Sequence, residues 1–275
     1  MTMPLDLVLV RHGESEGNLA VEAAKTGDAG LFTDGFMTTP GHQWRLTDRG
    51  RDQARTIGAW VAGEFPKFHR YYASPYVRTK ETAGWMQLPE ARWLLNRALR
   101  ERDWGEIGSI PKTEFESRPE YELNARHRKQ DPLYWVAPGG ESIAFVAEDR
   151  VRNVLDTLHR ECGEQQVVCV THGEVMWAFR LVLERMDDLR FKELDDDPSA
   201  KIHNCMAFHY SRVNPQDPAD VSRRLEWMRT ARPVQDEDSK EWTVEESGWT
   251  HVEYSAFSSD DLIAQVERVI PVLDQ

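Results

Sequence analysis

Cysteine is scarce in this chain of 275 residues, which contains only Cys162, Cys169 and Cys205. The three show no CxxC spacing, and any pairing among them leaves one over. Neither a disulfide framework nor a zinc cluster is therefore expected. Such sparse cysteine is typical of a reducing compartment, and we expect a cytoplasmic protein.

Long hydrophobic runs are also missing. No window approaches 18 uninterrupted apolar residues, so we expect no membrane span. The N-terminal stretch MTMPLDLVLV has no basic n-region and is ended by Arg11-His12, which makes it a poor signal peptide. Internal repeats and low-complexity tracts are absent too. The composition, 40% hydrophobic and 29% charged, is ordinary for a soluble globular protein.

Basic residues are fewer than acidic ones. The chain has 34 Lys and Arg and 47 Asp and Glu, which gives a formal net charge of −13. A negative field repels phosphate backbones, so we expect no nucleic-acid partner. It also repels anionic substrates, so a phosphate site in this protein must concentrate positive charge of its own.

Apolar runs of strand length alternate with amphipathic helical stretches. This alternation predicts an α/β fold, a single three-layer α/β/α sandwich around a mostly parallel central sheet. Strands are expected at 5–10, 71–73, 93–98, 167–170 and 205–210. Helices are expected at 49–64 with Asp48 as the cap, 75–87, 142–161 and 174–184.

Two regions are harder to interpret. Residues 20–44 are rich in Gly and Thr, and we expect a loop beside the functional site with some helix at its start. Residues 214–247 hold many charges, three prolines and no sustained periodicity, which predicts a partly ordered extension. A last amphipathic helix is expected at 259–269.

Two of the expected strands end in the same pair of residues. His12-Gly13 follows the first strand, and His172-Gly173 follows the strand at 167–170. Ligands of open α/β sheets collect at the carboxyl ends of strands. If these strands are neighbours, the two histidines face each other across one crevice, where a neutral imidazole can attack phosphorus and form a covalent intermediate.

Positive charge is available near these histidines. Arg11 adjoins His12, and Arg78 follows the strand at 71–73, from which it can clamp a phosphoryl group through two nitrogens. The helix opened by Glu174 can aim backbone N–H groups at the same anion. Fixed positive charge of this kind stabilises a transferring phosphoryl group.

Six sequence motifs occur in a fixed order. They are LVRHGESEGN at 9–18, LTDRG at 46–50 with QA at 53–54, SP at 74–75 with RT at 78–79 and TA at 82–83, LRERDWG at 99–105, PGGES at 138–142 and VTHG at 170–173. Together they resemble the histidine phosphatase superfamily, in the branch that includes cofactor-dependent phosphoglycerate mutase. The resemblance covers about three quarters of the chain, and it implies a catalytic domain at 1–213 with an extension at 214–275 packed on it.

The resemblance implies a role for each matching residue. The catalytic set is His12 as the nucleophile that becomes phosphorylated, Glu101 as the proton donor, and Arg11, Arg78 and His172 as ligands of the phosphoryl oxygens. Asn18 and the Gly173 N–H add hydrogen bonds, while Ser15 is either a phosphate donor or a turn residue. Glu106 is the alternative acid, but Glu101 has the family spacing after Leu99-Arg100. No metal and no other cofactor is implied, and no metal-ligand spacing occurs.

Burial would raise the pKa of Glu101 and nearby arginines would lower it, so its net shift stays open.

The reaction is less fixed than the site. A mutase needs contacts for a substrate carboxylate, and neither Gly17-Asn18 nor the segment 109–137 resembles the mutase pattern. We therefore expect hydrolysis of a phosphorylated small molecule, with a phosphoprotein, a mutase reaction and a non-catalytic phosphate-binding module as alternatives. The basic cluster 126–129 either recruits an anionic leaving group or is the solvated face of a helix. We favour the second interpretation. An oligomer is possible on this sequence.

Overall fold

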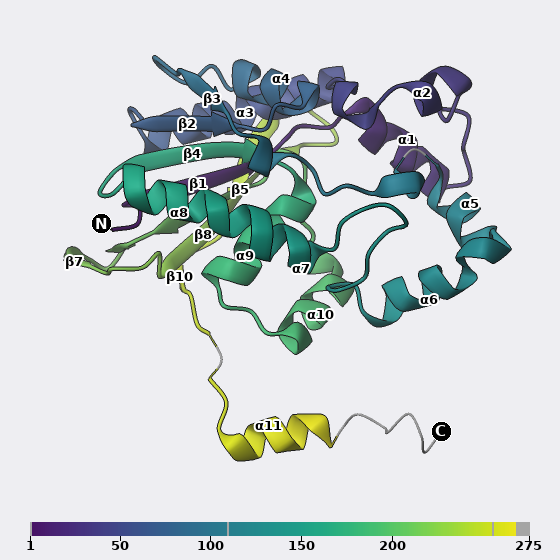
Figure 1. Cartoon of the computed structure of the whole chain (residues 1–275). Coiled ribbons are helices and arrows are strands. Elements are labelled where there is room, and N and C mark those ends of the chain that lie inside the picture. Colours follow the sequence, from purple (N-terminus) through teal and green to yellow (C-terminus); the bar gives the residue numbers. More distant parts are fainter. Residues whose placement is uncertain (1, 109, 255, 268–275) are drawn as a thin grey trace.

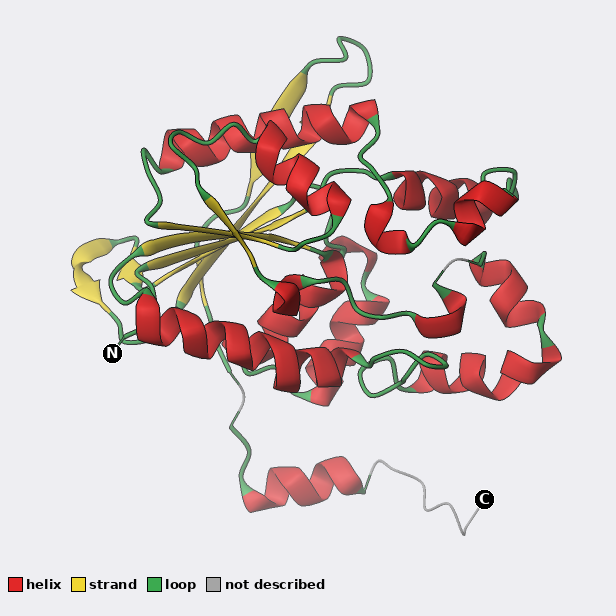
Figure 2. Cartoon of the chain, turned by 45° about the horizontal axis from the view of Figure 1, so that its top comes forward, coloured by secondary structure: helices red, strands yellow, loops and turns green. Residues whose placement is uncertain are grey.

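The computed structural model describes residues 2–108, 110–254 and 256–267, and it has a central sheet with helices on both faces (Figures 1 and 2). The strands of this sheet are β1 (Asp6–Arg11), β2 (Arg70–Ala73), β3 (Trp93–Leu95), β4 (Gln166–Thr171), β5 (Ala207–Ser211), β8 (Trp227–Gln235), β9 (Trp242–Glu246) and β10 (Thr250–His251). A separate hairpin is formed by β6 (Val213–Asn214) and β7 (Asp217–Val221).

The helices comprise a major set and several short turns. The set is α1 (Glu16–Lys25), α2 (Asp34–Thr38), α3 (Asp48–Glu64), α4 (Val77–Trp85), α5 (Lys112–Ser117), α6 (Glu122–Gln130), α7 (Ile143–Phe145), α8 (Arg152–Glu161), α9 (Gly173–Leu183), α10 (Asp188–Asp196) and α11 (Ser259–Val266). A π-helical segment at Val146–Val151 joins α7 to α8. Short 3₁₀ turns lie at Gly41–Gln43, Arg97–Leu99, Gly105–Ile107, Pro119–Tyr121 and Pro198–Ala200.

The strand order is β10-β8-β5-β1-β4-β2-β3, with β9 also paired to β8. Strands β1, β4, β2 and β3 are parallel neighbours, whereas β5, β8, β9 and β10 join through antiparallel pairs. Five of the eight strands described in this sheet therefore run in one direction. The predicted three-layer α/β fold with a mostly parallel sheet is confirmed.

Strand β1 lies in the middle of the sheet and is buried on both faces, as its continuous Leu and Val sequence predicts. Leu7 and Leu9 pack on the side covered by α8 and α9. Val8 and Val10 pack on the opposite side, against α3 and α4. Two apolar cores of this kind hold the central strands in place, and with them the residues that follow each strand.

Several element boundaries differ from the predicted ones. Thr47, not Asp48, caps α3, because its hydroxyl accepts the Gly50 N–H at 3.0 Å. The helix predicted at 75–87 ends at Trp85, and Gln87 has a positive φ of 49°. The predicted strand at 93–98 is only three residues long, since a 3₁₀ turn follows it at Arg97–Leu99.

The regions that were harder to interpret are more regular than expected. Within 20–44 the structure adds α2, which begins after Thr33, whose hydroxyl accepts the Phe36 N–H. The segment 214–247, expected to be partly ordered, contributes strands, and β8 pairs with β5 in the central sheet. The last helix runs from Ser259 to Val266, and the predicted end at 269 lies outside the described residues. The division at residue 213 stays a prediction.

Strands β1 and β4 are parallel neighbours in register, with Arg11 opposite Thr171. Both therefore end at the same edge of the sheet, which faces α1, α2, α5 and α6 in Figure 1. This arrangement brings the two His-Gly pairs together, as the sequence predicts.

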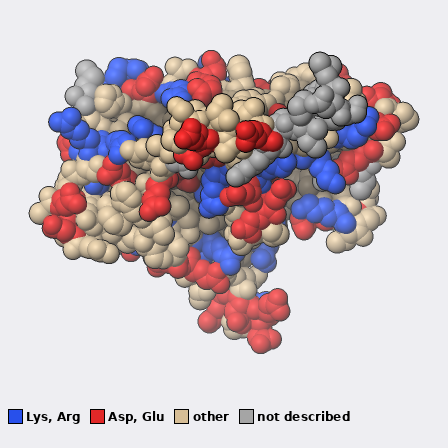
Figure 3. Space-filling model, turned by 90° about the horizontal axis from the view of Figure 1, so that it is seen from below, with Lys and Arg blue, Asp and Glu red and all other residues tan. Residues whose placement is uncertain are grey.

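Among the described residues, no helix is long and apolar enough to span a membrane. On the face shown in Figure 3, Lys and Arg side chains are interspersed with Asp and Glu. This mixture differs from the continuous basic stripe that a nucleic-acid-binding surface presents.

Candidate active site

His12 follows directly after β1, and its side chain is buried. Its position depends on close backbone packing behind it. A Cβ on Gly13 would lie 2.4 Å from the Gly50 carbonyl oxygen, and one on Gly50 would lie 2.0 Å from that of Glu14. The turn after β1 therefore needs glycine in both segments, and this explains why LTDRG accompanies the His12 motif.

Two hydrogen bonds fix the tautomer of His12. Its Nδ1 lies 2.7 Å from the Gly13 carbonyl oxygen, which can only accept, so Nδ1 carries the proton. Arg78 Nε donates to Nε2 at 3.0 Å, so Nε2 holds the lone pair. Burial, assisted by Arg78 and Arg11, lowers the pKa of His12 well below its ordinary value, although the Gly13 bond opposes this. His12 is a neutral imidazole with Nε2 as its basic nitrogen.

His172 lies beside His12, with 5.1 Å between the ring centroids in an edge-to-face arrangement. It is fully buried and caps α9, which begins at Gly173. Its Nε2 lies 2.9 Å from Ser74 Oγ, and its Nδ1 lies 3.7 Å from Glu101 Oε2. Burial, with further contributions from Arg78 and His12, lowers the pKa of His172 well below its ordinary value.

Two arginines bring positive charge to the histidines. Arg78 comes from α4, is buried, and also donates from Nη1 to the Gly41 carbonyl oxygen at 2.7 Å. Arg11, the last residue of β1, donates from Nη1 to the Ile202 carbonyl oxygen at 2.6 Å. The Arg11 guanidinium lies next to the start of α9, because a Cβ on Gly173 would be 3.4 Å from Arg11 Nε.

Two buried nitrogens at this point make no hydrogen bond with the described part of the chain. They are Arg11 Nε and His172 Nδ1. A buried polar atom without a partner costs about 1–3 kcal/mol, so it points to a ligand that completes its bonding. Since both atoms flank His12, an anion between the two histidines is the fitting ligand.

Glu101 follows the turn at Arg97–Leu99, and 17% of its side chain is exposed. Its Oε2 lies 4.0 Å from Arg78 Nη2 and 3.7 Å from His172 Nδ1. Burial raises the pKa of Glu101 to about 7, even though Arg78 lowers it and Glu174 adds to the rise. The sequence left open whether burial or the nearby arginines decide the pKa of Glu101, and in the structure burial has the larger effect. Glu101 can therefore exchange a proton near neutral pH.

Asn18 and Ser15 cap α1 together. Ser15 N and Oγ donate to Asn18 Oδ1 at 3.2 and 3.1 Å, and Ser15 Oγ accepts the Asn18 N–H. Asn204 Nδ2 also donates to Asn18 Oδ1, at 3.0 Å, and to the His12 carbonyl oxygen at 3.1 Å. Because Oδ1 is engaged, Nδ2 is the side-chain atom of Asn18 left to donate to a ligand, and the predicted substrate contact of Asn18 stays a prediction. The hydroxyl of Ser15 serves the helix cap, so its predicted contact with substrate stays a prediction.

The predicted set of His12, Arg11, Arg78, Glu101 and His172 is therefore brought to one place. Other residues that shape the site were missed in the sequence. Ser74 supports His172, Thr82 accepts the Gly13 N–H at 3.0 Å, and Asn204 fixes the turn after His12. Ser74 and Thr82 lie inside the motifs, so their spacing was available as a signal, whereas Asn204 carries no local pattern.

The same groups have a geometry that a metal ion can use. Ligand-type atoms of His12, Glu101 and His172 lie within 4.8 Å of one another. Among them, His12 Nε2 is the atom that accepts the hydrogen bond from Arg78. A cation at that position would meet the guanidinium groups of Arg78 and Arg11, whereas a phosphoryl group would be attracted by both.

A cavity of about 270 Å³ lies against Arg78 and Glu101. Residues from the segments 37–44 and 101–108 line it, together with Tyr76. The bond from Arg78 to Gly41 ties the first of these segments to the site. Trp44 anchors the same segment, since its ring fills the space that a side chain on Gly17 would need, 2.3 Å from the ideal Cβ.

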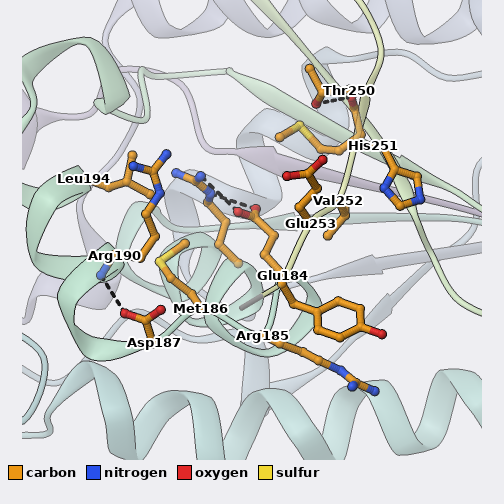
Figure 4. Close-up of a pocket in the computed structure, with 13 residues that line it drawn as sticks. Glu184, Arg185, Met186, Asp187, Arg190, Leu194, Thr250, His251, Val252 and Glu253 are labelled. Carbon is orange, nitrogen blue, oxygen red and sulfur yellow. Dashed lines mark hydrogen bonds and ion pairs between the residues drawn. The ribbon is translucent and has the colours of Figure 1, made fainter. Parts of the chain in front are cut away.

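A larger cavity of about 490 Å³ lies elsewhere, between α9, α10 and β10 (Figure 4). Its arginines are already engaged: Arg180 pairs with Glu184 at 2.9 Å, Arg185 stacks on Tyr254, and Arg190 bonds Glu193. None of the predicted site residues lines it.

The basic cluster 126–129 lies on α6 and does not line the 270 Å³ cavity. Arg126 and Lys129 are exposed, while the Arg128 guanidinium packs 5.2 Å from the ring centroid of Trp104 and 5.3 Å from that of Trp135.

Comparison with known proteins finds similar sequences and similar folds. A 2,3-bisphosphoglycerate-dependent phosphoglycerate mutase of Azorhizobium caulinodans is 33% identical over 192 residues, which cover 66% of this chain and 82% of the relative. A mycobacterial glucosyl-3-phosphoglycerate phosphatase in complex with VO3 has a TM-score of 0.57 at 19% identity, over 87% of this chain and 96% of that chain. Phosphoserine phosphatase of Entamoeba histolytica with 3-phosphoglyceric acid has a TM-score of 0.56 at 22% identity, over 76% and 90%.

These two structures share the fold. The sequence pattern of the histidine phosphatase superfamily (branch 1) matches residues 7–205, which include every one of the predicted site residues. The chain belongs to the histidine phosphatase superfamily.

Proposed function

We propose that this protein is a phosphatase that hydrolyses a phosphomonoester through a phosphohistidine on His12. The observation that carries the proposal is the tautomer of His12: Nδ1 is held as a donor by Gly13, and the lone pair of Nε2 points to Arg78. A neutral, oriented imidazole is a nucleophile that needs no base to activate it.

In the first step His12 Nε2 attacks phosphorus while the bond to the leaving oxygen breaks. Arg78 turns its donors from Nε2 to the phosphoryl oxygens, and Arg11 Nε supplies a second charged contact. We infer that Ser74 donates to His172 Nε2, so that His172 Nδ1 carries the proton it presents to the phosphoryl group. The first N–H groups of α9, from Gly173, lie at the positive end of the helix.

Glu101 completes the chemistry. In its protonated form it gives its proton to the departing alcohol oxygen. The resulting carboxylate then takes a proton from water, which attacks the phosphohistidine, releases inorganic phosphate and restores neutral His12. A pKa of about 7 leaves Glu101 near half protonation at neutral pH, which suits a group that acts once as acid and once as base.

We infer that no metal is needed. Arg11 and Arg78 supply the charge that a metal would otherwise bring to the phosphoryl oxygens. A cation bound to His12 Nε2 would also remove the lone pair on which the reaction depends.

A mutase reaction is the second candidate, favoured by the 33% identical relative of that name. It differs in one respect, because a mutase returns the phosphoryl group to an acceptor alcohol instead of water. Two features support hydrolysis. Gly17, where the sequence departs from the mutase pattern, accommodates the Trp44 ring, and the basic cluster 126–129 of the segment 109–137 contributes no residue to the described lining of the cavity.

The test is phosphate release from para-nitrophenyl phosphate with EDTA present, comparing wild type with His12→Ala. We expect turnover by wild type in EDTA and none by the variant. Interconversion of phosphoglycerates is measured in parallel with the same preparations. Mutase turnover that exceeds hydrolysis would favour the second candidate, and full activity of His12→Ala would remove the proposed nucleophile.

A further inference from the structure

The cavity beside Glu101 is placed to receive the alcohol half of the substrate. In an in-line displacement the leaving oxygen lies opposite the nucleophile, and the proton donor must reach it. Glu101 and Arg78 line this cavity, whereas His12 is not among the described residues that do. An alcohol in the cavity would therefore have Glu101 within reach and the phosphoryl group between itself and His12.

The cavity is small. Its volume of about 270 Å³ falls just below the range of about 300–1,000 Å³ that is typical of pockets for drug-sized ligands. A short or single-ring alcohol fits this space, whereas a nucleotide or a folded phosphoprotein loop needs more room.

The permanent positive charges that line the cavity are already engaged. Arg102 donates from Nε to the Glu141 carbonyl oxygen at 2.7 Å, from Nη1 to Glu174 at 3.0 Å and from Nη2 to the Trp135 carbonyl oxygen at 3.0 Å. Arg78 bonds His12 and the Gly41 carbonyl oxygen, and the proposed reaction directs it to the phosphoryl group. Within the described lining, no further guanidinium or ammonium group is left to pair with a charged alcohol.

The rest of the lining includes acidic and aromatic side chains, beside His42 and the small or apolar residues of the segment 37–41. Asp103 is exposed and accepts the Gly105 N–H through Oδ1 at 2.8 Å, and Glu101 lies nearby. Tyr76 places its ring 5.0 Å from that of His172, and Trp104 is held by the Arg102 guanidinium at 4.6 Å from its ring centroid. Aromatic faces of this kind pack well against an aryl or sugar ring.

From these observations, and resting on the proposed function, we propose that the cavity selects phosphomonoesters of small uncharged alcohols and rejects alcohols that carry a carboxylate or a second phosphate. A charged group would lose water without meeting a free guanidinium or ammonium group in the described lining, and it would face Asp103. An unpaired charge in a desolvated site works against the wrong ligand even when its shape fits.

A matched pair of substrates isolates the charge. The phosphate esters of 4-hydroxybenzamide and 4-hydroxybenzoate have nearly the same shape, but only the second alcohol carries a carboxylate. We expect kcat/KM to be about 10- to 100-fold higher for the amide at pH 7. Glycerol 3-phosphate against 3-phosphoglycerate repeats the comparison with aliphatic alcohols, and the same order is expected.

Two variants assign the effect to the cavity. Asp103→Asn keeps the acceptor for the Gly105 N–H but removes the charge. We expect it to lower the ratio of kcat/KM for the amide ester to kcat/KM for the carboxylate ester several-fold. The matched control is Glu106→Gln, which removes one charge nearby but outside the lining, where Glu106 accepts the Tyr121 hydroxyl at 2.9 Å. Its ratio should stay at the wild-type value. Met37→Arg adds a cation at an exposed lining position and should raise kcat/KM for the carboxylate alone.

An amide-to-carboxylate ratio of one or less in wild type would overturn the inference, as would equal effects of Asp103→Asn and Glu106→Gln. Calorimetric Kd values of the two esters for His12→Ala measure how strongly the cavity binds each ester when the proposed nucleophile is missing. If wild type hydrolyses neither ester but this variant still prefers the amide, the proposed function fails and the inference about the cavity stands.

Discussion

The pH dependence of Glu101 is the most informative consequence of the site. With a pKa of about 7, roughly half of the Glu101 population carries its proton at pH 7, against about 0.2% for a glutamate with an ordinary pKa. Burial therefore raises the supply of the acidic form about 250-fold. Above pH 7 this form falls about tenfold per pH unit, and kcat/KM for an aliphatic phosphate ester should fall with it.

The assay is kcat/KM between pH 5 and 9 at constant ionic strength, for wild type and Glu101→Gln. The phosphate of the substrate titrates near pH 6 by itself, so the wild-type-to-variant ratio is the quantity to read, because it cancels that titration. We expect a ratio of about 10² to 10⁴ below pH 6, declining with a midpoint near 7. A ratio below about three, or one that stays flat from pH 5 to 9, would refute the role given to Glu101.

The acidic side of the same profile tests His12. An ordinary histidine would take up a proton near pH 6.5 and lose its nucleophilic lone pair. Because burial and the two arginines hold the pKa of His12 well below that value, kcat/KM should show no loss from this group between pH 7 and pH 5.5. Since His12 is present in both enzymes, this test uses kcat/KM of each enzyme after correction for the titration of the substrate phosphate, and a further acidic decline with a midpoint near pH 6.5 in both would contradict the buried, neutral state.

Further predictions concern the stability of the fold and the contacts that hold His172 and Trp44 in place. The raised pKa of Glu101 means that its negative charge destabilises the fold. This cost is absent below about pH 4 and complete above about pH 7, so Glu101→Gln should be more stable than wild type by on the order of 3–4 kcal/mol at pH 8 and equally stable at pH 4 in urea unfolding. Ser74→Ala removes the partner of His172 Nε2 and should lower kcat about tenfold, while Ser74→Thr, which keeps the hydroxyl, should recover part of it. Gly17→Ala places a Cβ against the Trp44 ring and should cost about 1–3 kcal/mol in thermal unfolding, with Trp44→Leu relieving most of the loss; equal stability of Gly17→Ala and wild type would contradict this packing.

The sequence was most informative where backbone geometry and chemistry coincide. A continuous apolar strand followed by His-Gly occurs twice, and the rule that ligands collect at strand ends was enough to bring His12 and His172 together. The motif order then added Arg78 and Glu101. The direction of the Glu101 pKa shift needed the structure, because burial and neighbouring arginines act in opposite senses and only their distances decide.

Other features had no signal of that kind. Strand β8 carries charged residues at 229 and 232 and Pro233, so its pairing with β5 and β9 comes from the partner strands and not from alternating apolar residues. The short helix α2 has too few residues for a period to be visible. Gly41 acts on Arg78 through a backbone carbonyl, which any residue type would supply.

The most direct test of the account is the position of the phosphoryl group on the protein. Wild type mixed with a 32P-labelled substrate and quenched in alkali within milliseconds should carry an acid-labile label, and the peptide containing His12 should yield phosphohistidine substituted at Nε2. Because Gly13 holds Nδ1 as a donor, substitution at Nε2 alone is expected, and His12→Asn should remain unlabelled. Label at Nδ1, label on another residue, or turnover in the complete absence of a labelled intermediate would contradict the central claim.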